Sequence, residues 1–274
     1  MASRPGFRAV ADDARPGALR AAFGLFTWIP SPPTQVDRAL ARRAVLALPW
    51  VGLFLGAAAG GVTALVLASG AGPLLAATLG VATVALASGA MHLDGLADTA
   101  DGLGSRAPAA KALDIMRRSD IGPMGVASLV LVLAIEIAAL SSPRVGWALP
   151  FVVAAMPLVG RVSAVEATGR WVGPARADGF GALFAAVTQP ASYAVTLSGA
   201  TTVVACLGAA GAVTVGSPIR GAIVFAGAAL ASWVLAWAWR RHLVRRLGGI
   251  TGDCIGSLIE VAQVSFAVVV ALAL

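Results

Sequence analysis

Long apolar stretches dominate the pattern of hydrophobic and polar positions along the chain. Each runs for roughly 18 to 26 residues, which as a helix is enough to cross a hydrocarbon core about 30 Å thick. The pattern predicts an all-α, polytopic membrane helix bundle of about seven spans, within a range of six to eight. The predicted spans are residues 44–69, 73–90, 124–141, 147–167, 191–215, 220–239 and 255–274.

The composition agrees with a protein that lies in the lipid bilayer. Of the 274 residues, 58% are hydrophobic and only 12% are charged, whereas soluble domains carry about 25% charged residues. We expect residues 1–22 to form a basic, disordered tail and residues 23–274 to form a single transmembrane domain. No apolar segment followed by a cleavage site opens the chain, so no secretory signal is expected.

The basic residues predict the orientation, because loops rich in Lys and Arg remain in the cytoplasm. With the spans above, all of the 20 Lys and Arg residues except Arg144 and Arg220 fall on one side of the membrane. The N-terminus and every long loop are therefore expected on the cytoplasmic side of the inner (cytoplasmic) membrane. The net charge of +7 reflects this topology and attraction to anionic lipid, so we expect no nucleic-acid partner.

Three carboxylates interrupt the apolar pattern directly after the second predicted span. Asp94, Asp98 and Asp101 are spaced so that, on a helix, they fall within about 60° of one another. Stacked carboxylates repel each other, which favours a positive ion between them. A divalent metal that carries a phosphorylated substrate meets this need. A solvated loop is the alternative, but it does not explain the helical spacing.

The residues around this cluster include groups that suit a phosphate. Lys111, Arg117, Arg118 and Ser119 follow the carboxylates, and basic side chains there would clamp phosphate oxygens. The excess of basic residues in cytoplasmic loops explains them equally well. His92 precedes the cluster and either orients a carboxylate, touches the phosphate or has a structural role.

A glycine-rich loop opens the last span on the same predicted face of the membrane. It contains Gly248, Gly249, Thr251 and Gly252, followed by Asp253. Glycines before a helix N-terminus leave backbone N–H groups free to bind phosphate. Asp253 either joins the acidic site or is the N-cap of the helix, a common position for Asp.

Charged residues inside predicted spans are costly there and are often functional. Arg161 and Glu166 share one span and are expected to pair or to extend toward its cytoplasmic end. We expect Glu136 to bond to another helix. Glu260 follows Asp253 by two helical turns and either extends the acidic site or is structural.

Four segments together resemble the signatures of cobalamin synthase, the adenosylcobinamide-GDP ribazoletransferase family. They are residues 26–30 (FTWIP), 92–102 (HLDGLADTADG), 115–122 (IMRRSDIG) and 248–253 (GGITGD). The resemblance extends over about residues 20–274 in the expected order and spacing. In the third segment the family usually has an acidic residue where this chain has Arg118, and often a basic residue where this chain has Asp120.

The resemblance implies a Mg²⁺-dependent membrane enzyme of late cobalamin (vitamin B12) biosynthesis. It would join adenosylcobinamide-GDP with α-ribazole or its 5′-phosphate, giving adenosylcobalamin or its 5′-phosphate and releasing GMP. Asp94, Asp98 and Asp101 would hold Mg²⁺ across the pyrophosphate. Asp253 would complete the coordination or accept the proton of the nucleophile. The remaining substrate and phosphate contacts implied are His92, Lys111, Arg117, Arg118, Ser119, Gly248, Gly249, Thr251 and Gly252.

Two other classes of protein are considered. A CDP-alcohol phosphotransferase also places D-G-x-x-A and further Asp residues on membrane helices, but the spacing here differs and that family has no counterpart of the glycine-rich loop. A transporter would have its site near the bilayer midplane, whereas these acids lie at one surface. Gly52, Gly56 and Gly60 form a small-residue stripe that favours helix–helix contact, so a homo-oligomer, or association with other corrinoid-pathway enzymes, remains open.

Overall fold

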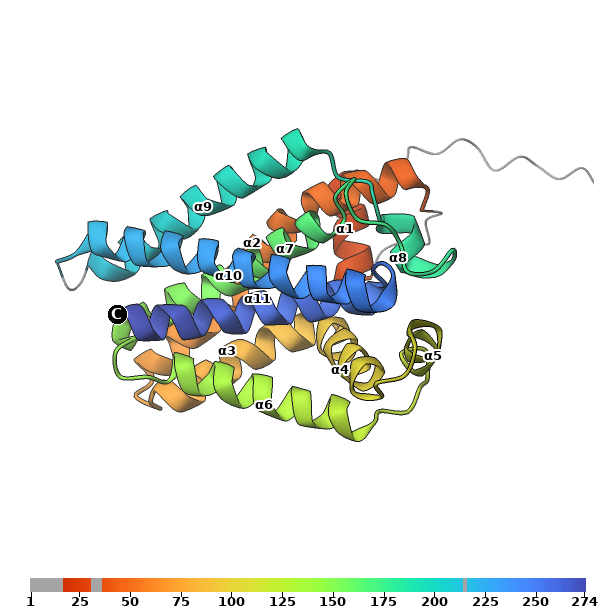
Figure 1. Cartoon of the computed structure of the whole chain (residues 1–274). Coiled ribbons are helices and arrows are strands. Elements are labelled where there is room, and N and C mark those ends of the chain that lie inside the picture. The colour runs from red at the N-terminus through yellow and green to blue at the C-terminus, as the bar shows by residue number, and fades with distance from the viewer. Residues whose placement is uncertain (1–16, 31–35, 214–215) are drawn as a thin grey trace, which may run out of the picture.

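A computed structural model describes residues 17–30, 36–213 and 216–274 of the chain. In these ranges the chain is a helical bundle without β-strands, and its long helices run side by side (Figure 1). The elements are α1 (Ala18–Phe26), α2 (Arg38–Ala68), α3 (Pro73–Ala87), α4 (Met91–Gly104), α5 (Ala109–Ile115), α6 (Pro123–Leu140), η1 (Gly146–Ala148), α7 (Leu149–Ala167), α8 (Gly179–Phe184), α9 (Pro190–Ala212), α10 (Pro218–Leu247) and α11 (Gly252–Ala273).

Helix α1 begins inside the segment that the sequence predicts as a tail. Its residues Ala22 and Phe26, one turn apart, are buried against the bundle, and α1 packs on α2. The predicted tail boundary at residue 22 is therefore corrected, because an apolar helix face gives this segment a place in the core. The rest of the expected tail, residues 1–16, lies outside the described residues.

Six helical segments of the described chain are long and apolar enough to cross a membrane, and a seventh is a bent pair. The bent pair corresponds to the second predicted span, in which α3 has only 15 residues and ends at Ala87. The chain then turns by 88° into α4. Gly89 and Ala90 make this turn with left-handed φ angles of 62° and 56°. The all-α bundle of six to eight spans is thus confirmed, and one predicted span includes a sharp bend.

The glycine stripe of α2 is used inside the chain, against α7. A Cβ atom on Gly56 would lie 2.0 Å from the carbonyl oxygen of Ala154, and one on Gly52 would lie 2.7 Å from that of Pro157. Gly60 makes a similar approach to Pro150. The stripe therefore brings the α2 and α7 backbones into direct contact, as small residues do between membrane helices.

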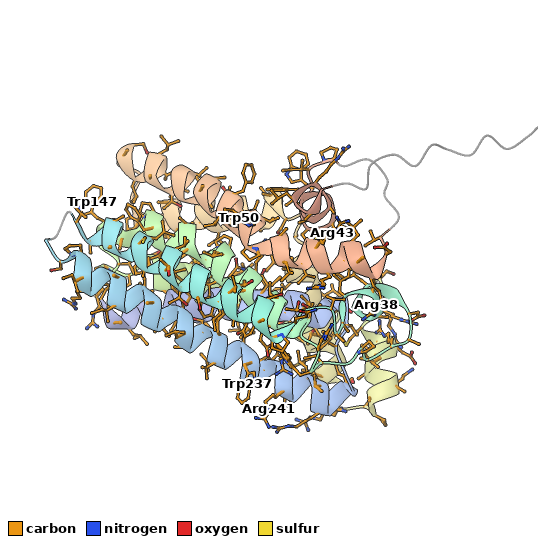
Figure 2. The ribbon with its side chains drawn as sticks, turned by 90° about the horizontal axis from the view of Figure 1, so that it is seen from above. Arg38, Arg43, Trp50, Trp147, Trp237 and Arg241 are labelled. Carbon is orange, nitrogen blue, oxygen red and sulfur yellow. The ribbon has the colours of Figure 1, made fainter. Side chains whose placement is uncertain are left out.

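The two ends of the bundle differ in charge. The short helices α4, α5 and α8 gather at one end, which we call the short-helix end, and the C-terminus lies at the other (Figure 1). Arg38, Arg43 and Arg241 lie toward the short-helix end and Trp147 toward the opposite end (Figure 2). Arg220 lies near the C-terminus, where its side chain donates to the Leu274 carbonyl at 3.3 Å. This distribution agrees with the asymmetry read from the sequence.

Buried charges connect the spans in a way that the sequence does not predict. Arg161 is fully buried and donates to the Gln263 side-chain oxygen at 3.3 Å, and its other terminal nitrogen lies 3.2 Å from His92 Nε2. Glu166 instead accepts from Arg240 Nε of α10, at 2.8 Å. The expected pairing of Arg161 with Glu166 is therefore wrong, because the two side chains face different neighbouring helices.

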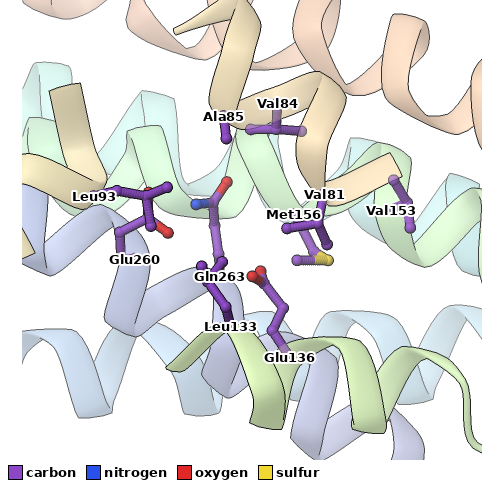
Figure 3. A pocket seen from close by; sticks show the side chains of 10 residues that line it. All are labelled: Val81, Val84, Ala85, Leu93, Leu133, Glu136, Val153, Met156, Glu260 and Gln263. Carbon is purple, nitrogen blue, oxygen red and sulfur yellow. The ribbon is translucent and has the colours of Figure 1, made fainter. Parts of the chain in front are cut away.

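Glu136 and Glu260 face a common cavity in the interior of the bundle (Figure 3). The cavity is small, with a volume of about 20 Å³, and has mostly apolar walls, including Leu133 and Met156. Within the described residues the Glu136 carboxyl has no hydrogen-bond partner, so the expectation that it bonds to another helix is wrong. Gln263, which also lines the cavity, connects it to Arg161.

Candidate active site

The crossing of α4 and α11 positions the predicted acidic residues. The two helices touch where Gly95 of α4 meets the backbone of Asp253, and a Cβ atom at Gly95 would lie 2.7 Å from the Asp253 carbonyl oxygen. One turn along α11, a Cβ atom at Gly256 would lie 3.2 Å from His92 Cα. Because both contacts are glycine to backbone, α4 lies directly on the first turns of α11. This brings Asp253 next to the acidic face of α4.

The carboxylates of α4 and α11 are close enough to affect each other's ionisation. Helix α4 lies beyond the bend and after residue 90, where the second predicted span ends, and its Asp98 is partly buried. Burial is the largest cause that raises the pKa of Asp98 to about 7. The charges of Asp94, Asp253 and Asp101 raise the pKa further, in that order, and Arg176 opposes them. Around Asp98, the negative charges of Asp94, Asp253 and Asp101 thus outweigh the opposing charge of Arg176.

Asp101 has a structural task in addition to its place in the acidic cluster. Its two carboxylate oxygens accept the backbone N–H groups of Gly122, at 2.7 Å, and Gly125, at 2.8 Å. These amides open α6, so the carboxylate meets free N–H groups at the positive end of the helix dipole. A Cβ atom at either glycine would fall within 2.5 Å of the Asp101 oxygens. Asp101 therefore fixes the start of α6 to α4.

The glycine-rich loop forms a fixed turn between α10 and α11. Helix α10 ends at Leu247, and its C-cap Gly248 has a left-handed φ of 81°. Gly249 passes so close to Pro174 that a Cβ atom there would lie 2.4 Å from its carbonyl carbon. Thr251 is the N-cap of α11, with its hydroxyl accepting from Cys254 N at 3.2 Å. The N-cap alternative for Asp253 is therefore wrong. Its carboxylate lies in the first turn, where one oxygen accepts from the Thr251 hydroxyl at 3.2 Å.

A pocket of about 100 Å³ lies beside this first turn of α11. It is lined by Thr251, Gly252 and Asp253 on one side and by Arg176 and Phe180 on the other. The loop that carries Arg176 is held by backbone pairing with the glycine-rich loop, since Ala175 N donates to Ile250 O at 2.9 Å. An anionic group in this pocket would meet a guanidinium and the N-terminus of a helix.

The structure corrects the assignment of His92 as a phosphate contact. The His92 ring is buried, with 5% of the residue exposed, and it contacts Arg161 inside the bundle. Asp94 is exposed two residues further along the same helix. Residues two apart on a helix differ by about 200°, so an outward Asp94 requires an inward His92. His92 thus anchors α4 and does not face the pocket.

The other predicted phosphate contacts lie at the short-helix end without lining this pocket. Lys111, Arg117, Arg118 and Ser119 are exposed on α5 and the loop after it. Arg117 pairs with Asp178 at 2.6 Å, which links this loop to the segment that carries Arg176. Arg176, in contrast, lines the pocket itself. In the sequence it is a basic residue in a glycine-rich connection between two predicted spans, which is weak evidence for a functional role.

The donors present suit a magnesium ion in chemical type. Mg²⁺ prefers carboxylate oxygens, and the excess of negative charge around Asp98 calls for a cation. As the side chains stand, no three acidic, His or Cys residues in the described part of the chain converge closely enough to hold a metal ion. The assignment of Asp94, Asp98, Asp101 and Asp253 as ligands therefore stays a prediction.

Comparison with known proteins identifies the family. The model of the family described as cobalamin-5-phosphate synthase matches residues 18–271, almost the whole chain. The chain belongs to the cobalamin-5-phosphate synthase family. This membership confirms the resemblance seen in the four sequence segments and favours it over the CDP-alcohol phosphotransferase and transporter alternatives.

Curated relatives of this cobalamin-5-phosphate synthase family member carry an enzyme name. A protein of Frankia casuarinae is 39% identical over 92% of this chain and 94% of its own length. Relatives from Nocardioides sp. and Bradyrhizobium diazoefficiens are 35% and 36% identical, over 89% and 92% of this chain and 94% and 92% of their own lengths. All three are named adenosylcobinamide-GDP ribazoletransferase. No solved structure matches the chain. The chain is therefore a transferase of cobalamin biosynthesis.

Proposed function

We propose that this protein joins adenosylcobinamide-GDP to α-ribazole or α-ribazole 5′-phosphate. The ribazole 3′-hydroxyl attacks the phosphorus linked to cobinamide, and the bond from that phosphorus to GMP breaks. The products are adenosylcobalamin or its 5′-phosphate, GMP and a proton. The names of the relatives support the substrates. The observation that carries the proposal is the meeting of Asp94, Asp98 and Asp253 beside Arg176 at one end of the bundle.

The acidic residues of α4 would hold Mg²⁺ in this reaction. Asp94 and Asp98 are the ligands we assign first, because Asp101 already accepts two backbone amides. A bound Mg²⁺ would neutralise charge on the pyrophosphate and on the departing GMP. Asp101 keeps α4 and α6 together and so fixes the direction in which the other two carboxylates point. This assignment rests on the charge of the cluster and on the oxygen ligands it offers.

Residues on the other side of the site would bind phosphate and receive the proton. Arg176 and the N-terminus of α11 line the pocket and offer donors to the oxygens of the leaving GMP. Asp253 belongs to a different helix from Asp94 and Asp98, and its carboxylate would accept the proton of the ribazole hydroxyl. Phosphoryl transfer depends mainly on positioning and charge neutralisation. The rigid α4–α11 crossing suits that requirement.

We propose that the short-helix end lies on the cytoplasmic side of the inner membrane. The reasons are the basic residues gathered at this end and the water-soluble nucleotide that has to reach it. A single cysteine introduced at exposed Ser119, in a chain whose Cys206 and Cys254 are replaced by Ser, tests this orientation. Labelling by a membrane-impermeant maleimide is expected in inverted vesicles and not in intact spheroplasts, and the reverse result would contradict the orientation.

A product assay on the purified chain in liposomes tests the reaction. With adenosylcobinamide-GDP, α-ribazole 5′-phosphate and Mg²⁺, chromatography is expected to show GMP and adenosylcobalamin 5′-phosphate in equal amounts. Chelation of the metal is expected to stop both. Asp98→Asn is expected to lose activity while Asp114→Asn, an exposed carboxylate of α5 outside the cluster, keeps it. Full activity in Asp98→Asn, or turnover in chelator, would overturn the assigned role.

A further inference from the structure

Helices α9 and α10 enclose a groove on a side of the bundle away from the acidic site. The two helices are joined by a short turn at one end and diverge toward the short-helix end, so the groove is V-shaped (Figure 1). The groove has a wide half toward the short-helix end and a narrow half toward the turn. Leu197 and Leu230 line both halves, which makes the groove continuous. Both helices are candidate membrane spans, so this groove is at lipid depth.

A buried ion pair forms the floor of the wide half. Arg240 is 94% buried, with 6% exposed, and its Nε donates to both carboxylate oxygens of Glu166, at 3.1 and 2.8 Å. Trp171 Nε1 also donates to Glu166, at 3.2 Å. Among the described residues, the two terminal nitrogens of Arg240 have no hydrogen-bond partner, although Arg240 lines the groove. Since these two nitrogens are not among the fully buried polar atoms, they are open to the groove, where a guanidinium can donate to an acceptor.

The mouth of the groove is aromatic and positively charged. Its walls include Tyr193, Trp233 and Trp237, and aromatic side chains of this kind gather at the interface between lipid and water. Arg241 stacks over the Trp237 ring at 4.7 Å. Glu166 is the only acid among the lining residues, and Arg240 already neutralises it. An anionic group is therefore favoured at the wide end.

We propose that this groove binds an anionic phospholipid. Its phosphate accepts hydrogen bonds from the terminal nitrogens of Arg240, and one acyl chain lies between Leu197 and Leu230 toward the narrow end. A lipid fits the shape because a bilayer leaflet also orders its molecules with the charged group outward and the chains inward. A free phosphate would use the donors but leave the apolar groove unfilled. This lipid site is separate from the proposed catalytic function and does not depend on it.

Native mass spectrometry of the purified full-length chain tests the site. The protein is stripped with detergent and then exposed to phosphatidylglycerol or to phosphatidylcholine at equal concentration. We expect one phosphatidylglycerol to be retained, with an affinity roughly tenfold above that of phosphatidylcholine, since each basic residue near a membrane surface adds attraction for anionic lipid. Because the assay contains no corrinoid or nucleotide, its result is independent of the transferase reaction.

Three variants separate the groove from its surroundings. Leu230→Trp fills the point where the two halves meet and is expected to lower phosphatidylglycerol retention about tenfold. Leu235→Trp is the matched control, because Leu235 is 49% exposed on the same helix and does not line the groove. The double variant Glu166→Gln with Arg240→Gln keeps a neutral hydrogen-bonding pair and is expected to abolish the preference for phosphatidylglycerol.

Each outcome decides for or against the proposal. Loss of retention in Leu230→Trp together with loss of preference in the double variant supports it. Equal binding of the two lipids by the unmodified chain overturns it, as does unchanged retention in Leu230→Trp. The same spectra report the oligomeric state, so conversion of a dimer to a monomer by Leu230→Trp would also overturn the proposal, by making a second copy of the chain the occupant.

Discussion

The contact between Gly95 and the Asp253 backbone allows a sharp test of the site geometry. In Gly95→Ala the new Cβ atom would lie 2.7 Å from the Asp253 carbonyl oxygen and 3.0 Å from its Cα. Ordinary contacts of this kind begin at 3.4 Å, so α4 and α11 have to move apart by about 0.7 Å. Backbone cannot rotate away as a flexible side chain does. Overpacking of this size costs about 1–3 kcal/mol of unfolding free energy.

The same displacement is expected to reduce activity far more than stability. It separates the carboxylates of α4 from Asp253, and a misplacement of about 1 Å lowers a rate by up to roughly 100-fold. We therefore expect the turnover of Gly95→Ala to fall roughly 10- to 100-fold. The measurement is GMP release in liposomes, with thermal unfolding and size-exclusion profile recorded on the same preparation.

Gly61→Ala is the matched control, because Gly61 lies on α2 with nothing within 4 Å of its added Cβ. It is expected to be neutral or slightly stabilising, as a glycine-to-alanine change in an open helical position usually is. A folded Gly95→Ala protein that turns over like the unmodified chain would refute the idea that this crossing sets the distance between the acidic groups.

The remaining predictions concern the charges of the bundle. The pKa of Asp98 is raised from 3.8 to about 7 in the folded state, so the folded state holds this proton more tightly than the unfolded state. The contribution of Asp98 to the unfolding free energy therefore falls as the pH rises from 3.8 to about 7. Asp98→Asn should therefore raise the metal-free melting temperature at pH 8 more than at pH 5, and equal shifts would contradict the assignment. Arg240→Met should destabilise by about 3–5 kcal/mol by leaving Glu166 unpaired, and adding Glu166→Leu should recover most of it in denaturant titration. Asp101→Asn should cost about 1–2 kcal/mol, because an amide NH2 replaces one of the two accepting oxygens and leaves one backbone N–H without a partner. This should appear as faster amide exchange in the first turn of α6; unchanged exchange would argue against the capping role of Asp101.

The apolar stretches were sufficient to predict the class of fold, because lipid allows few alternatives to a helix of spanning length. They did not predict the bend between α3 and α4. Gly89 and Ala90 look unremarkable in an apolar run, and only the structure gives both a left-handed φ. The glycine stripe of α2 was recognisable as a packing surface, but its partner, α7, lies about 100 residues away along the chain and sequence alone cannot name it.

The candidate site was predictable in its acidic half and less so elsewhere. The helical spacing of Asp94, Asp98 and Asp101 predicted one face. The glycine-rich loop and the family resemblance already suggested Asp253, and the structure places Asp253 near that face. For His92 the sequence left three roles open, and the structure favours the structural one, because the helix directs the His92 and Asp94 side chains oppositely. Ion pairs between residues far apart in the chain, such as Arg240 with Glu166, depend on how each helix is rotated about its own axis. A local sequence pattern does not determine that rotation.

The 88° bend before α4 has a consequence for how evenly the acidic residues meet water. Seven residues separate Asp94 from Asp101, a rise of roughly 10 Å along a helix. Had α3 simply continued, that rise would run through the bilayer and each carboxylate would sit at its own depth, in its own dielectric. Laid across the end of the bundle, α4 instead keeps all three at one level. In the proposed reaction, a metal–nucleotide arriving from solution would then meet the whole acidic row at once, and none of its members would have to be ionised within hydrocarbon.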